Sequence, residues 1–122
     1  MQYQISESDL GGFCVITLEG GVGNSDILEM HKDILEAEAK YHHNAFLIDI
    51  RNLHGRPEIL SFMHKSGKLP AGSWERIGKM AVLDDVGHRI DAIIAETLMK
   101  ARGLHVKFFF DERMAVEWLI TP

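Results

Sequence analysis

Residues 45–50 read Ala-Phe-Leu-Ile-Asp-Ile, a short run in which five of the six side chains are apolar. A run of this length is typical of a β-strand that is covered on both faces, because a strand with one solvated face would alternate apolar and polar side chains. Asn44 precedes the run and Arg51 follows it. We therefore predict that residues 45–50 form the central strand of a sheet.

A hairpin and a helix are predicted before this strand. Residues 3–5 alternate in polarity, residues 13–18 are almost wholly apolar or β-branched, and a glycine-containing turn separates them. Apolar residues then recur with a helical period, and this helix is expected to end at Asn44. Its predicted inward face carries Ile27, Met30, Ile34, Ala37 and Tyr41, and its predicted solvent face carries His31, Lys32, Asp33, Glu36 and Lys40.

Helices and strands alternate after the central strand. The predicted elements are a helix from Pro57 to near Gly67, a loop at 67–74, a strand at 77–83, a helix at 86–101, a strand at 106–110 and a helix capped by Asp111. The predicted inward residues of the last two helices are Ile90, Ile93, Ile94, Thr97, Leu98 and Ala101, then Met114, Ala115, Trp118 and Leu119.

The resulting order is β-β-α-β-α-β-α-β-α. Strands separated by helices pair in parallel through crossovers, whereas the opening hairpin adds an antiparallel pair. The sequence therefore predicts an α/β fold, a mixed β-sheet flanked by helices. With no internal repeat or second core pattern, we expect a single domain at residues 1–122.

Composition and charge exclude several classes of protein. The 122 residues are 46% hydrophobic and carry a formal charge of −5, which disfavours a disordered chain and a nucleic-acid partner. Cys14 is the single cysteine and is expected to be an inert core thiol, which suits the cytoplasm. No apolar run approaches the roughly 20 residues of a membrane span, so we expect a soluble or membrane-peripheral protein.

The charge is divided unevenly along the chain. Residues 1–61 hold four Lys+Arg against ten Asp+Glu, a net charge of −6, whereas residues 62–122 hold nine against eight. The local excess of bases at Lys100, Arg102 and Lys107 would suit an acidic partner or an anionic membrane surface. Solvated side chains at helix and strand ends are the simpler interpretation.

Three stretches of the chain resemble the SpoIIAA-like family, which is related to the STAS domain. They are Leu-Ile-Asp-Ile-Arg at 47–51, Trp-Glu-Arg-Ile at 74–77 leading into Met-Ala-Val-Leu-Asp at 80–84, and the ending at 106–119. With the order of elements, the resemblance covers nearly the whole chain. It implies a STAS/SpoIIAA-like fold and a binding or regulatory module that is not an enzyme.

The resemblance also implies how regulation differs here. In regulatory STAS domains, a serine at the start of the helix after the Asp-bearing strand is phosphorylated, and this switches partner binding. The matching position falls near Pro57 and Glu58, where there is no serine. Ser66 lies further on, where a phosphate would meet the negative end of the predicted helix. The usual switch is therefore expected to be absent.

The SpoIIAA-like branch resembles lipid-carrying domains in fold, which implies a pocket for an apolar small molecule or lipid. Such pockets are lined mainly by aliphatic and aromatic side chains, although the same residues would also suit an ordinary core. Apolar residues beside Lys65 and Lys68 further suggest peripheral membrane contact. The predicted lining residues are Leu60, Met63, Leu69, Trp74, Ile90 and Ile94.

A second candidate site lies at the carboxyl end of the central strand, where open α/β sheets place ligand crevices. Arg51, Asn52, His54 and Arg56 would together meet an anion, and His54 oriented by Asp49 would be a general base. No nucleophile lies in this stretch, and the chain has neither a zinc-helix spacing nor a phosphate-loop motif. We therefore expect no catalytic residue, metal or cofactor, and keep a small α/β enzyme at this crevice as the alternative to a module that binds a protein partner or apolar ligand.

Overall fold

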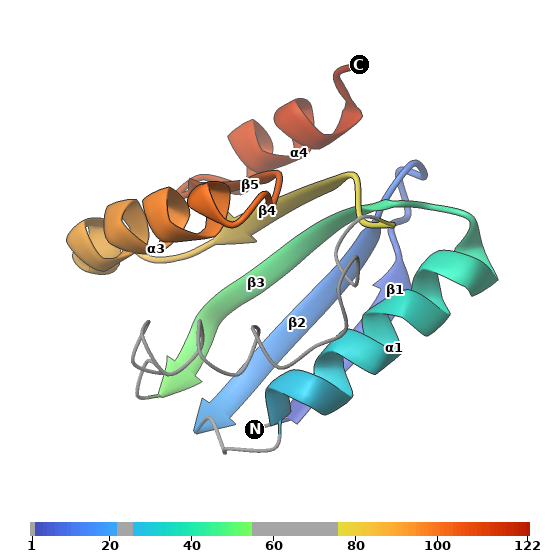
Figure 1. Ribbon diagram of the computed structural model, residues 1–122, viewed down its shortest axis with the longest axis horizontal. Coiled ribbons are helices and arrows are strands. Elements are labelled where there is room, and N and C mark those ends of the chain that lie inside the picture. The colour runs from blue at the N-terminus through green and yellow to red at the C-terminus, as the bar shows by residue number, and fades with distance from the viewer. Residues whose placement is uncertain (1, 22–25, 55–75) are drawn as a thin grey trace.

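The computed structural model describes residues 2–21, 26–54 and 76–122 (Figure 1). The strands are β1 (Gln2–Glu7), β2 (Cys14–Gly21), β3 (Ala45–His54), β4 (Lys79–Leu83) and β5 (Val106–Phe109). The helices are α1 (Asp26–Tyr41), the short 3-10 helix η1 (Val86–His88), α3 (Arg89–Ala101) and α4 (Glu112–Ile120). The helix predicted to begin at Pro57 and the loop predicted at 67–74 lie outside the described residues.

The five strands form one sheet in the order β1-β2-β3-β4-β5, so β3 lies at its centre. β1 pairs antiparallel with β2, and all other neighbours pair in parallel. These pairings confirm the predicted mixed sheet and the predicted central strand.

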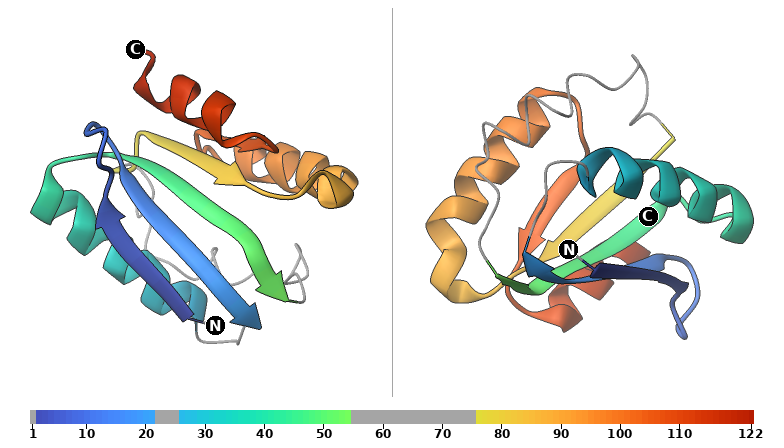
Figure 2. Two further views of the ribbon diagram at one scale, coloured as in Figure 1. Left: turned by 180° about the vertical axis from the view of Figure 1, so that it is seen from behind. Right: turned by 90° about the horizontal axis from the view of Figure 1, so that it is seen from below.

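Side chains of β3 alternate between two hydrophobic cores. Phe46 and Ile48 belong to a first core together with residues of α1, and Leu47 belongs to a second core with residues of α4. Figure 2 shows α1 and α4 on opposite faces of the sheet. Because both faces of β3 are covered, both sets of alternate side chains must be apolar, which explains the continuous run at 45–50.

The inward face of α1 agrees with the helical period. Ile34 and Ala37 are buried, and Met30 and Tyr41 pack partly against the first core, whereas the side chain of Ile27 is outside the described part. Two details differ. His31 is buried rather than solvated, and the helix ends at Tyr41 because His42 adopts a positive φ of 61°.

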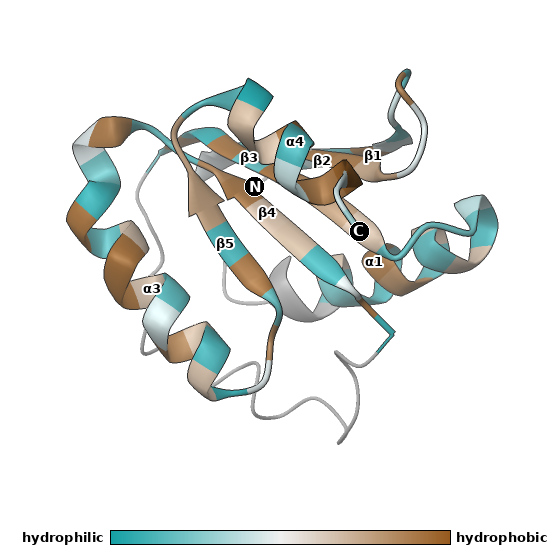
Figure 3. Ribbon diagram, turned by 90° about the horizontal axis from the view of Figure 1, so that it is seen from above, coloured by the Kyte–Doolittle hydropathy of each residue, from teal (hydrophilic) through white to brown (hydrophobic). Residues whose placement is uncertain are grey.

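α3 is turned away from its predicted orientation. Its buried residues are Ala92 and Ala95, whereas the exposed fractions of Ile90, Ile93 and Ile94 are 72%, 59% and 47%. Figure 3 shows hydrophobic segments along α3. The prediction that these isoleucines face inward is therefore wrong. It is also wrong for Thr97 and Ala101, which are exposed. The small side chains of alanine allow a helix backbone to approach a sheet closely. The side of α3 that is buried is therefore explained by the size of its side chains and not by their hydrophobicity.

The ends of the last two helices follow the sequence signals. Gly103, with φ of 88°, donates its N–H to Lys100 O at 3.0 Å just after α3, a conformation that glycine adopts without strain. The Asp111 side chain accepts the N–H of Met114 at 3.2 Å and caps α4. Ala115 and Leu119 are buried as predicted, but Met114 is exposed, which corrects its predicted inward position.

The Cys14 thiol is predicted to be unreactive in the folded protein. It is fully buried, and burial followed by the charge of Glu7 raises the pKa of the thiol. Because the thiolate is the reactive form, a thiol reagent such as DTNB should label Cys14 only as urea unfolds the chain. The control variant Leu10→Cys, at an exposed turn position, should be labelled at once. Rapid labelling of native Cys14 would contradict its place in the core.

Candidate functional site

The carboxyl ends of β3, β4 and β5 lie at the same end of the sheet because these strands are parallel. The Asp84 N–H donates to Phe109 O at 2.9 Å, so the segment after β4 lies directly beside the end of β5. We call residues 49–54, 84–88 and 110–114 the carboxyl rim.

β3 is longer than predicted. It continues past Ile50 and pairs with β2 up to His54, whereas its pairing with β4 stops at Asp49. Arg51, Asn52 and His54 therefore lie within the strand rather than in a loop beyond it, and all three are exposed. The strand extends because β2 offers partners over this whole length.

A β-bulge interrupts β3 beside Asp49. Between the pairs Thr17–Asp49 and Glu19–Asn52, β2 advances by two residues and β3 by three. The extra residue reverses the alternation of side chains, which is why Leu53 packs against the first core. Residues beyond the bulge thus face the opposite way from what a regular strand would predict.

The Asp49 carboxylate closes this bulge. Its Oδ1 accepts the backbone N–H of Arg51 at 3.1 Å and Nε at 3.0 Å, and its Oδ2 accepts Nη2 at 2.8 Å. Bidentate pairing of this kind fixes both the distance and the plane of the guanidinium group. Asp49 is therefore engaged by Arg51, not by His54, and the ion pair holds the backbone of the bulge.

The electrostatics of the pair link three elements of the rim. Burial alone would raise the pKa of Asp49, but the hydrogen bonds from the side chain and backbone of Arg51 hold that pKa below its ordinary value. The hydrogen bond to Asp49 raises the pKa of Arg51, and the charges of Glu112 and Asp85 contribute in the same direction. Arg51 therefore lies within electrostatic reach of α4 and of the segment after β4.

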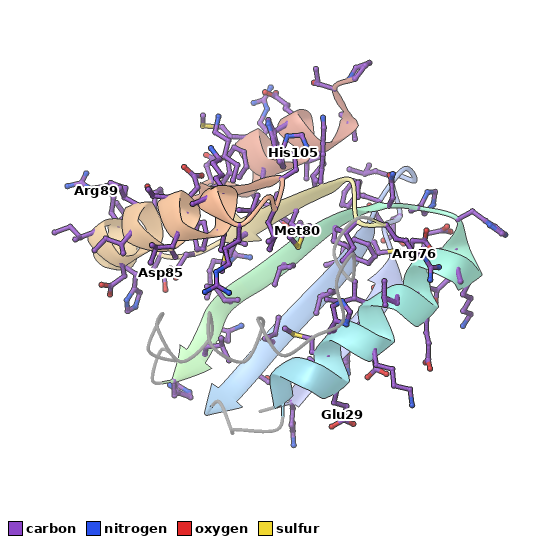
Figure 4. All side chains as sticks on the ribbon, viewed as in Figure 1. Glu29, Arg76, Met80, Asp85, Arg89 and His105 are labelled. Atoms are coloured by element: carbon purple, nitrogen blue, oxygen red, sulfur yellow. The ribbon has the colours of Figure 1, made fainter. Side chains whose placement is uncertain are left out.

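Carboxylates and exposed apolar side chains gather at the rim. Asp85 and Glu112 are exposed, as are Val86, Phe110 and Met114. Figure 4 shows Asp85 and Arg89 near the start of α3. A cluster of exposed large apolar side chains beside charged groups is typical of an interaction surface. The sequence did not predict that Met114 and Phe110 belong to a surface. The helical period assigned Met114 to the core, and Phe110 was included in a predicted strand.

Most of the predicted lining of the apolar pocket lies outside the described residues. Leu60, Met63, Leu69 and Trp74 lie outside the described residues, as do Lys65, Ser66 and Lys68. Ile90 and Ile94 lie on the outer side of α3, away from the buried Ala92. The pocket, the membrane contact and the anion crevice of Arg51, Asn52 and His54 stay predictions.

In the described part of the chain, no group of three or more His, Cys, Asp and Glu side chains is arranged to hold a metal ion. Across the same ranges, no helix is both long and apolar enough to cross a membrane.

Replacing Asp49 by Asn is predicted to destabilise the fold in a pH-dependent way. A lowered pKa in the folded state means that the carboxylate contributes stability above the unfolded-state pKa and loses this contribution as the pH falls through the folded-state pKa. We expect Asp49→Asn to lower the free energy of unfolding by about 1–2 kcal/mol at pH 7, with the difference shrinking below about pH 4. Urea unfolding between pH 7 and pH 3 measures this difference.

The matched control is Arg113→Gln, which removes the exposed Arg113–Glu117 pair, separated by 3.6 Å. Exposed pairs contribute little, so the change in unfolding free energy should stay below about 0.5 kcal/mol. A pH-independent cost of Asp49→Asn would show that the charge of Asp49 is not what stabilises the bulge.

Comparison with solved structures connects this arrangement to a known fold. An anti-sigma factor antagonist from Mycobacterium paratuberculosis is 15% identical, with 98% of this chain and 94% of that chain covered at a TM-score of 0.63. An uncharacterized DUF3478 family protein with a SpoIIAA-like fold from Shewanella loihica PV-4 is 22% identical, with 97% and 92% covered at a TM-score of 0.65. No protein-family model and no curated protein matches the sequence. The chain therefore has a SpoIIAA-like fold, as its resemblance to the SpoIIAA-like family implied.

Proposed function

We propose that this chain is a non-enzymatic regulatory module that binds another protein through the carboxyl rim. The observation that carries the proposal is the exposure of Val86, Phe110 and Met114 beside Asp85 and Glu112. Removing large apolar side chains from water contributes most of the favourable free energy of binding a partner. The surrounding charges restrict which partner fits.

The charges of the rim indicate the chemistry of that partner. Two arginines of the rim are already paired, Arg51 with Asp49 and Arg113 with Glu117. Asp85 and Glu112 add negative charge around the apolar group. The complementary surface presents aliphatic or aromatic side chains flanked by lysine or arginine.

A fold neighbour supports a protein partner. One of the two similar structures is an anti-sigma factor antagonist, a name that denotes action on another protein. The other carries no described activity. A regulatory role for this chain follows by analogy of fold, so the exposed rim carries the argument.

The residues of the rim favour binding over catalysis. Residues 49–54, 84–88 and 110–114 contain no serine, threonine, cysteine or lysine, so the rim itself offers no hydroxyl, thiol or amine nucleophile. Asp49, which would orient His54 in the enzyme alternative, is bonded to Arg51. A small enzyme at this crevice is therefore the weaker candidate.

An apolar ligand is the second candidate. It is favoured by Ile90 and Ile94, two of the predicted lining residues, because they are exposed rather than packed in the core. A lipid held against α3, with peripheral attachment to a membrane, would use these side chains. The test of the partner surface also distinguishes this candidate.

Site-specific photo-crosslinking is predicted to capture a protein at the rim. With benzoylphenylalanine in place of Phe110 or Met114 in the native cells, we expect an adduct of protein mass. The variant Asp85→Lys/Glu112→Lys should reduce its yield about tenfold, because like charges across an interface are repulsive.

Leu10 is the matched control position, because it is exposed but lies in the β1–β2 turn, at the opposite end of the sheet. Equal adducts from Leu10 and Phe110 would contradict a specific rim surface. Native mass spectrometry of the purified chain completes the test. A stoichiometric lipid that is lost in Ile90→Ser/Ile94→Ser, without any protein adduct at the rim, would favour the apolar-ligand candidate instead.

A further inference from the structure

The two edge strands of the sheet, β1 and β5, differ in how far they are protected against the addition of another strand. At β5, the Phe108 N–H donates to the Glu96 carboxylate of α3 at 2.8 Å, and Glu96 pairs with Lys100 at 3.5 Å. A side chain thus takes a backbone donor that an additional strand would need. β5 is also only four residues long and carries the exposed Lys107, so this edge is protected against strand addition.

The β1 edge lacks the short length and the exposed lysine that protect β5. β1 reads Gln-Tyr-Gln-Ile-Ser-Glu, with no lysine, arginine or proline. Its register with β2 runs unbroken from Gln2–Glu19 to Glu7–Cys14, so no bulge bends it away. In the part of the chain that the structure describes, only β2 pairs with β1, which lies at one side of the sheet (Figure 2).

The hydrogen-bond pattern identifies the backbone groups at this edge. The Ser8 N–H donates to Phe13 O at 3.0 Å, and antiparallel strands alternate between residues that bond the neighbour and residues that face away. The even-numbered residues of β1 therefore bond β2. The backbone N–H and C=O groups of Ile5 and Glu7 face outward, at the two-residue spacing that an added strand uses.

Acidic side chains lie along the same edge. The Tyr3 hydroxyl donates to the Asp33 carboxylate, so this flank of α1 lies on the β1 side. Glu29 and Glu36 are exposed one turn to either side of Asp33, and Figure 4 shows Glu29 on the outer side of α1. Glu7 adds a carboxylate at the end of β1, bonded to His43 at 2.8 Å.

We propose that the outer edge of β1 binds an extended, lysine- or arginine-bearing segment of a partner protein as a sixth strand. The backbone of Ile5 and Glu7 supplies the hydrogen bonds, and alternate basic side chains of the partner reach Glu29, Asp33 and Glu36 on α1. This surface runs along the side of the sheet and is separate from the carboxyl rim, so it is independent of the proposed function.

A second copy of the chain fits this edge less well. Antiparallel pairing of two β1 strands about a two-fold axis places both α1 helices on the same face of the joined sheet. The flanks that carry Glu29, Asp33 and Glu36, and with them the single base Lys40, would then face each other, and because each flank keeps a net negative charge they repel. Charge complementarity therefore selects a basic partner.

Binding of a defined peptide tests the proposal. The probe is a fluorescein-labelled acetylated hexapeptide, Lys-Val repeated three times, measured by fluorescence anisotropy at low salt with the full chain. We expect saturable binding that weakens with added salt. The fully N-methylated peptide keeps the charge but loses the amide donors, so it should bind about tenfold more weakly or worse, and the Glu-Val repeat should not bind.

Two variants locate the binding edge. Glu7→Pro removes an N–H that faces outward, which an edge strand tolerates, and Glu29→Lys/Glu36→Lys reverses the acidic flank without touching β1. Each should weaken binding about tenfold while circular dichroism shows a folded chain. The rim variant Asp85→Lys/Glu112→Lys is the control and should bind as the parent does.

Several results would overturn the proposal. Equal binding of the parent and N-methylated peptides would show attraction by charge alone, without strand addition. Unchanged affinity in Glu29→Lys/Glu36→Lys, or no binding at millimolar peptide, would also reject it. A stable dimer of the free chain that dissociates in Glu7→Pro would show that a second copy takes the edge instead.

Discussion

β3 must bury both of its faces, and this requirement determines where the helices lie. Phe46 contributes to the core beneath α1, and Leu47 contributes to the core beneath α4. With two parallel neighbours, the strand also has its backbone groups engaged on both sides over residues 46–49. Removing the helix layer from either face would expose one set of these apolar side chains to water, so the layers stabilise each other through this strand.

Beyond Asp49, β3 is paired on one side only within the described residues. β4 no longer pairs with β3, and the bulge closed by Asp49 and Arg51 turns the strand while β2 still pairs with it. A bulge re-aims the side chains that follow it, and the ion pair keeps that arrangement from slipping back into regular register. The exposed end of β3 therefore owes its orientation to one carboxylate.

The sequence predicted the elements whose signals are local and continuous. The apolar run at β3, the helical period of α1 and the cap at Asp111 all lie within single segments, and each appears in the structure. The rotation of α3 was missed because Ala92 and Ala95 carry little hydrophobic signal, although their size lets the helix approach the sheet. The bulge was missed because it depends on the register between β2 and β3, which lie far apart in sequence. For the same reason, the grouping of Asp85, Phe110 and Glu112 at the rim follows from the pairing of β4 with β5 and not from their spacing along the chain.

The hydrogen bond between Phe108 and Glu96 has a consequence for assembly at scale. Endless polymerisation through sheet edges needs two compatible ends on every subunit, as in cross-β fibrils. Here a carboxylate from α3 accepts the outward-facing N–H of Phe108 at the β5 edge, which disfavours the addition of a further strand there. Endless polymerisation through both edges of the sheet is therefore disfavoured.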